Sequence, residues 1–102
     1  MDLKSGSRWK SITCTTEIMV VRPPRAPLQL ECGGHKMRPA ADPALPAISP
    51  APDRAGGTPL GKRYEDAASG IEVLVIKPGA GSLAVNGQPL TQKQAKALPA
   101  SD

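Results

Sequence analysis

Two stretches of the chain share one pattern: residues 14–37 read CTTEIMVVRPPRAPLQLECGGHKM, and residues 69–90 read SGIEVLVIKPGAGSLAVNGQPL. They align with an offset of 55 residues before the central turn and 53 residues after it. The two-residue difference falls in the turn, where a change in chain length costs little. An internal repeat of this kind predicts a single architecture that is built twice.

The first copy has the pattern of two strands joined by a turn. Residues 13–21 are rich in β-branched side chains, Pro23-Pro24 ends that strand, and residues 28–32 return. Gly33-Gly34 then permits a tight turn with positive φ. We therefore predict a β-hairpin followed by a glycine turn, here called a hairpin knuckle, over residues 13–37.

The second copy repeats the arrangement with a more regular first strand, residues 71–76 (IEVLVI). Its turn is at residues 78–81, and residues 82–85 return. Asn86-Gly87 is a strong tight-turn signal, because both residues tolerate positive φ. A second hairpin knuckle is predicted over residues 61–90.

The segments outside the knuckles differ in character. Residues 1–12 are polar and predict a loose N-terminal arm. Residues 38–60 hold six Pro and six Ala without apolar periodicity, which indicates a linker, either a disordered spacer or a docking segment for a partner. Residues 91–94 (TQKQ) form a capping-box pattern, so residues 91–102 should be a short helix and tail. The fold class expected is a small all-β protein.

Composition narrows the choice of function. The chain of 102 residues is one small domain or two very small lobes, and Trp9 and Tyr64 are its only aromatic residues. The net charge of +4 comes from scattered basic residues, which argues against nucleic-acid binding. No apolar leader and no stretch long enough for a bilayer is visible, so we expect a cytoplasmic protein without a membrane partner.

The two cysteines, Cys14 and Cys32, both lie in the first copy, where they face Ser69 and Val85 of the second. Any thiol chemistry therefore belongs to the first copy alone. In a reducing compartment, free thiols or metal ligands are expected in preference to a disulfide. A Cys14–Cys32 bridge is the alternative if the hairpin brings the two together.

The repeat resembles the desulforedoxin family, the small rubredoxin-type knuckle in which C-x-x-C and C-C-G-x-x-M motifs supply four thiolates to one iron. Here residues 11–14 (SITC) and 32–37 (CGGHKM) take the places of these motifs. Ser11 and Gly33 replace two of the ligands, and the second copy retains none. The resemblance implies a compact antiparallel knuckle and does not imply the family's electron transfer.

A metal site can still be proposed from Cys14, Cys32 and His35. Three nitrogen and sulfur ligands with one open position suit zinc, and soft thiolates also suit iron. The other interpretation is that the cysteines are small buried apolar residues and His35 is an exposed turn residue. A homodimer could pool ligands across its two-fold axis.

The function predicted is that of a small non-catalytic accessory protein that packs on a larger partner, an enzyme subunit for example. Two thin lobes bury little core, so an external surface is a natural source of stability. Trp9 is a candidate interface anchor, although completing the core of the first hairpin is the favoured role. Ile71, Val73 and Val75 are candidates for strand addition along an open sheet edge. The alternative is a rubredoxin-type metalloprotein that carries iron or zinc.

Overall fold

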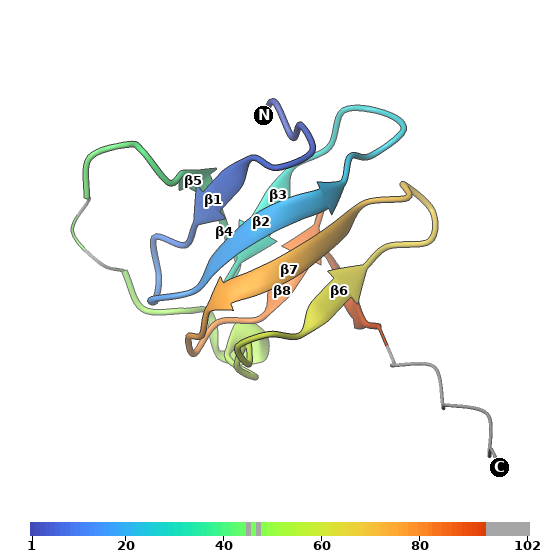
Figure 1. The fold of residues 1–102 in the computed structure, drawn as a ribbon. Coiled ribbons are helices and arrows are strands. Elements are labelled where there is room, and N and C mark those ends of the chain that lie inside the picture. The colour runs from blue at the N-terminus through green and yellow to red at the C-terminus, as the bar shows by residue number, and fades with distance from the viewer. Residues whose placement is uncertain (45, 47, 94–102) are drawn as a thin grey trace, which may run out of the picture.

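The computed structural model describes residues 1–44, 46 and 48–93, and it contains two antiparallel sheets and one 3-10 turn, η1 (Pro52–Arg54) (Figure 1). The six-stranded sheet has the order β10 (Thr91–Gln92), β6 (Arg63–Glu65), β7 (Glu72–Lys77), β2 (Glu17–Arg22), β1 (Arg8–Lys10) and β5 (Arg38–Pro39). The four-stranded sheet has the order β4 (His35–Lys36), β3 (Leu30–Cys32), β8 (Leu83–Val85) and β9 (Gln88–Pro89). The predicted small all-β fold class is confirmed.

The two halves of the chain contribute their strands in the same order. At the centre of the sheets β2 pairs with β7 and β3 pairs with β8, and the remaining strands follow outward in corresponding positions. Backbone hydrogen bonds correspond as well: the Gly6 amide donates to the Val20 carbonyl at 2.7 Å, and the Gly61 amide donates to the Val75 carbonyl at 2.9 Å. Each sheet is thus assembled from both halves.

The predicted pairing within each hairpin is wrong. Strand β2 pairs with β1 and β7, whereas β3 pairs with β4 and β8, so the two strands of each expected hairpin belong to different sheets. A two-stranded ribbon would leave one apolar face in water. Crossing from one sheet to the other lets the apolar faces of β2 and β7 cover those of β3 and β8. Figure 1 shows the four-stranded sheet behind β2 and β7.

The core lies between the sheets and follows from strand alternation. In β2 the side chains of Ile18 and Val20 are buried, and in β7 those of Val73 and Val75 are buried. The facing sheet contributes Leu30, Cys32, Leu83 and Val85. The tight turn predicted at Asn86-Gly87 is present, because Asn86 (φ 48°) and Gly87 (φ 81°) adopt the positive φ values that such a turn requires.

The N-terminal segment 1–12 is not a loose arm. Residues 8–10 form β1, and Trp9 is directly opposite Ile18 of β2. Leu3 and Trp9 are both buried in the core, and the indole Nε1 of Trp9 donates to Ser7 Oγ at 3.0 Å. A three-residue strand with one apolar side chain is too short for its alternation to be recognised in the sequence.

The described part of the Pro/Ala-rich segment 38–60 packs against both halves. Its first residues form the edge strand β5, and the Ala51 amide donates to the Gly33 carbonyl at 2.9 Å. From the other half, the Ser82 amide donates to the Arg54 carbonyl at 2.8 Å. This part of the segment therefore supplies backbone partners to glycine-rich turns, instead of acting as a free spacer.

The C-terminal helix is not found where it was expected to begin. Thr91 and Gln92 form β10, which pairs with β6, just as the matching strand β5 of the first half pairs with β1. Residues 94–102, which contain the rest of the predicted helix, lie outside the described residues. Within the residues described, no helix is long and apolar enough to cross a membrane.

Candidate functional site: a paired-thiol centre

The two cysteines lie together although they come from different sheets. Cys14 is in the loop between β1 and β2, Cys32 is the last residue of β3, and their Sγ atoms are 3.8 Å apart. Both are free thiols; Cys32 is buried and Cys14 is partly exposed. A disulfide bond needs a sulfur–sulfur distance of about 2.05 Å. The two sulfurs are close enough to form a Cys14–Cys32 disulfide after a small movement, but both cysteines are free thiols here.

A serine turn positions Cys14. The Ser11 hydroxyl accepts hydrogen bonds from the backbone amides of Thr13 at 3.0 Å and Cys14 at 3.3 Å. It also lies 3.4 Å from Cys14 Sγ, and the Thr16 hydroxyl lies 3.2 Å from the same sulfur. Ser11 thus places a hydroxyl, and not a third thiol, next to the Cys14 sulfur.

Two glycines of the opposite half press against the pair. A Cβ atom on Gly79 would lie 2.8 Å from Cys14 Sγ, and one on Gly81 would lie 2.9 Å from Cys32 Sγ. The Gly81 amide donates to Cys14 Sγ at 3.3 Å. Thr58 holds this loop, here called the glycine loop (residues 78–82), by pairing with Gly79 and donating its hydroxyl to the Gly81 carbonyl. Side chains are excluded at both positions because the glycine backbone packs closely on Thr16 and Cys14 at Gly79, and on Cys32 and Gly33 at Gly81.

These contacts separate the pKa values of the two thiols. Partial burial alone would raise the pKa of Cys14, but hydrogen bonds from Ser11, Thr16 and the Gly81 amide outweigh it and lower that pKa to about 6. Burial raises the pKa of Cys32 to about 11, and the nearby charge of Cys14 acts in the same direction. Near neutral pH the pair therefore holds one thiolate and one thiol.

This arrangement can support nucleophilic sulfur chemistry. A thiolate that is partly exposed is the reactive form of cysteine, and a second thiol within reach can displace whatever the first has bound. Cys14 lines a small cavity of about 130 Å³ together with Lys10, Ile12 and Arg38. The sulfur is therefore open to a small molecule on a side lined by two cationic side chains.

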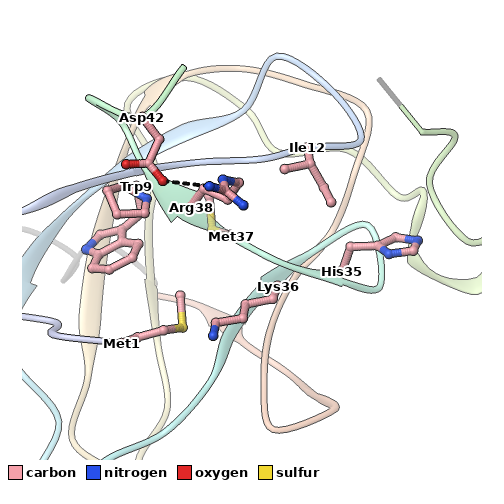
Figure 2. A pocket seen from close by; sticks show the side chains of 9 residues that line it. Met1, Trp9, Ile12, His35, Lys36, Met37, Arg38 and Asp42 are labelled. Atoms are coloured by element: carbon pink, nitrogen blue, oxygen red, sulfur yellow. Dashed lines mark hydrogen bonds and ion pairs between the residues drawn. The ribbon is translucent and has the colours of Figure 1, made fainter. Parts of the chain in front are cut away.

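His35 is not part of this centre. It is opposite Cys32 in the β3–β4 pair, but its side chain lines a different groove, where Figure 2 shows the imidazole pointing away from Met1 and Trp9. Among the described residues, no group of three or more His, Cys, Asp or Glu side chains is placed to hold a metal ion. The predicted set of Cys14, Cys32 and His35 is thus not brought together.

The spacing of the two sulfurs can be compared with that of two ligands of a tetrahedral metal centre. With metal–sulfur bonds of about 2.3 Å, the edge of a tetrahedron is about 3.8 Å, and this matches the Sγ–Sγ distance of 3.8 Å. The other groups around Cys14 are the neutral hydroxyls of Ser11 and Thr16, which are weak ligands for iron or zinc. The described residues of a single chain do not fit a complete site for either metal.

The residues predicted to bind a partner lie in the core. Trp9 is 6% exposed, and Ile71, Val73 and Val75 are between 0 and 1% exposed. Strand β7, which was expected at an open edge, is central between β2 and β6. The edge strands β5 and β9 each contain a proline, Pro39 and Pro89, which disfavours strand addition there.

The second half has no thiol pair at the position that corresponds to Cys14 and Cys32. Ser69 and Val85 stand where the first half has its cysteines, and Gly70 is covered by the guanidinium of Arg25. That guanidinium donates to the carbonyls of Ala67 at 2.9 Å and Ala68 at 2.8 Å. The loop that contains Arg25 connects β2 to β3, just as the glycine loop connects β7 to β8. Each half therefore contributes a loop that packs on the other half.

Sequence analysis missed the glycine loop, Thr16 and Arg38 as parts of the site. The only signal was that Pro78 is followed by the small residues Gly-Ala-Gly, where the first copy has Pro-Arg-Ala-Pro after Pro23. The role of these small residues depends on contacts between the two halves, and the sequence of one segment does not reveal such contacts. The chain was compared with protein-family models, curated proteins and solved structures, and none of the three comparisons gave a match. What the protein does is therefore inferred from the thiol centre itself.

Proposed function

We propose that the protein is a thiol-dependent redox protein in which Cys14 is the nucleophile and Cys32 is the resolving thiol. The observation that supports this most directly is the 3.8 Å distance between a partly exposed sulfur, surrounded by hydrogen-bond donors, and a buried one. Low-pKa, accessible cysteines beside a second thiol are the usual arrangement of redox-active pairs.

The proposed reaction with a disulfide has two steps. The Cys14 thiolate forms a bond to one sulfur of the disulfide, and the other sulfur leaves as a thiolate. Cys32 then gives its proton to that thiolate and attacks Cys14, which forms the Cys14–Cys32 bond and releases the second sulfur as a thiolate. Two electrons pass from the protein to the disulfide, so one bridge is formed and one is broken.

The test is reaction of the reduced protein with one equivalent of the neutral probe bis(2-hydroxyethyl) disulfide, followed by intact-mass and peptide mass spectrometry. We expect an internal Cys14–Cys32 bridge and a monomer two hydrogens lighter. The Cys32→Ser variant should stop at a mixed disulfide on Cys14, and Cys14→Ser should react far more slowly. Equal rates for Cys14→Ser and the unmodified protein, or bridges only between chains, would overturn the proposal.

We further propose that the chain arose by duplication of a desulforedoxin-like knuckle and works in the cytoplasm. The corresponding strand order of the two halves supports the duplication. A reducing cytoplasm would return the pair to two thiols after each oxidation.

The accessory-partner and metal predictions stay predictions. A larger protein partner would have to use surfaces other than the four buried residues first considered. Metal analysis of protein purified without chelators distinguishes a free redox dithiol from a pair of cysteines that bind a metal. Stoichiometric iron or zinc that is lost in Cys32→Ser would favour a shared metal site, with ligands from a second copy, over a free dithiol.

A further inference from the structure

A groove adjoins the cavity at Cys14. The groove has a volume of about 530 Å³, and its lining includes Trp9, Ile12, Lys36, Arg38 and Asp42 (Figure 2). Ile12 and Arg38 also line the small cavity that Cys14 opens into. Ligand pockets for small organic molecules commonly have volumes of this size. Arg38 therefore connects a groove of ligand size to the reactive sulfur.

The lining of the two spaces is positively charged. Lys10, Lys36 and Arg38 contribute cations, and Asp42 is the only carboxylate among the described lining residues. Arg38 Nη2 donates to the Asp42 carboxylate at 2.9 Å, and Lys10 Nζ donates to the Asp42 backbone carbonyl. After these contacts, a net positive charge remains beside the thiolate.

One donor of Arg38 is left over. Its Nε is buried and has no hydrogen-bond partner among the residues that the structure describes. The Arg38 side chain as a whole is 41% exposed, so it can be reached by a ligand in the groove. The planar guanidinium matches the two oxygens of a carboxylate. In Figure 2 one side of this guanidinium faces Asp42 and the other faces Ile12, which lines both spaces.

We propose that the thiol centre takes small disulfides that carry a carboxylate, with Arg38 holding the carboxylate while Cys14 attacks the sulfur. This inference rests on the proposed thiol function. The bond changes are those of the two-step exchange above: Cys14 forms a mixed disulfide, one sulfur fragment leaves as a thiolate, and Cys32 releases the second.

The test compares three probes that differ in charge: dithiodiglycolate (anionic), bis(2-hydroxyethyl) disulfide (neutral) and cystamine (cationic). Rates of mixed-disulfide formation are measured in the Cys32→Ser background at low ionic strength. The readout is the ratio of the anionic rate to the neutral rate. A change in the pKa of Cys14 affects both rates alike and cancels in this ratio, so the ratio reports recognition of the charge.

Arg38→Gln should lower this ratio about tenfold, the effect of losing one charge-assisted contact. Asp42→Asn should raise it, because Arg38 loses its competing carboxylate. Lys62→Gln removes the same charge from an exposed position in the other half and should leave the ratio within about twofold. Thermal denaturation of each variant checks that it folds, and Asp42→Asn provides a change of opposite sign that misfolding would not produce.

Two outcomes overturn the inference while the thiol function stands. One is a ratio that Arg38→Gln and Asp42→Asn leave unchanged, and the other is an equal loss in Lys62→Gln. If Cys14 reacts with none of the three probes, the proposed function fails and the inference fails with it.

Discussion

The two cysteines differ because of where the fold places them. Cys14 receives contacts from Ser11, Thr16 and the Gly81 amide, whereas Cys32 is buried at the end of β3. Identical side chains therefore acquire pKa values on opposite sides of neutrality, about 6 and about 11. At neutral pH the more accessible of the two sulfurs is also the ionised one.

The alkylation rate of Cys14 should rise with pH to a midpoint near pH 6, following its pKa of about 6. Iodoacetamide and peptide mass spectrometry measure the rate at each residue. In Ser11→Ala the midpoint should move upward, because a donor to the thiolate is removed. In Cys14→Ser, the remaining Cys32 should stay unreactive until the solution is strongly alkaline. A midpoint near the ordinary value of 9.0 would contradict this prediction.

At this scale the sequence indicated part of the site. The sequence analysis raised the possibility that the hairpin brings Cys14 and Cys32 together, and their Sγ atoms lie 3.8 Å apart, with Ser11 Oγ 3.4 Å from Cys14 Sγ. The His35 side chain lies in the neighbouring groove and not beside the two sulfurs, because spacing along a turn does not set the direction of a side chain. Arg38 and Thr16 were missed because their importance depends on a cavity and a sulfur contact, and neither is encoded in local pattern.

At the scale of elements, the glycine loop is the part that is least tolerant of change. Gly81→Ala would place its Cβ 2.9 Å from Cys32 Sγ and 3.0 Å from the Gly33 amide nitrogen. We expect this variant to lose about 1–3 kcal/mol of unfolding free energy by overpacking. Urea denaturation measures the loss, and Ala80→Ser, at an exposed position of the same loop, is the matched control. Equal midpoints for the two variants would mean that the loop is not packed as described.

Glu72 of β7 joins several elements through a buried carboxylate. Lys93, Arg63 of β6 and Arg22 of β2 approach it at 3.0, 3.2 and 3.9 Å, and its side chain is 2% exposed. The hydrogen bond from Lys93 is the main cause that lowers the pKa of Glu72, although burial opposes it. Glu17 holds the matching position on β2 but has Lys77 at 3.6 Å and a more exposed side chain.

Glu72→Gln should lower the unfolding free energy at pH 7 by about 1–3 kcal/mol, more than Glu17→Gln does. Because the folded pKa of Glu72 is lowered from 4.5, its contribution is complete above pH 4.5 and is lost as the pH falls through the folded value. The variant should therefore depend less on pH in acid than the unmodified protein. Urea titrations at several pH values measure this, and indistinguishable acid profiles would refute it.

The sequence predicted the positions of the strands better than it predicted which strands pair with each other in a sheet. The expected strand at residues 71–76 differs from β7 by one residue at each end, whereas the expected strand at residues 13–21 begins four residues before β2. Their partners were missed because a turn of few residues is compatible both with a hairpin and with a crossing between sheets. Burial of both apolar faces decides in favour of the crossing, and that is a property of the complete molecule.

At the scale of the whole molecule, the halves should unfold together. The central pairs β2–β7 and β3–β8 each join one half to the other, so neither half can lose its strands alone. Amide NMR signals of β1 and β6 should therefore disappear with one urea midpoint, coincident with the fluorescence of Trp9. Two separate midpoints would show that the halves are independent domains.

The crossing of the glycine loop onto the thiol pair has a consequence for the newborn chain. While the ribosome has released only the first half, residues 78–82 are absent and Cys14 lacks the Gly81 amide. The hydrogen-bond environment of that sulfur, and the packing of the glycine loop on it, are therefore complete only when translation has supplied the second half.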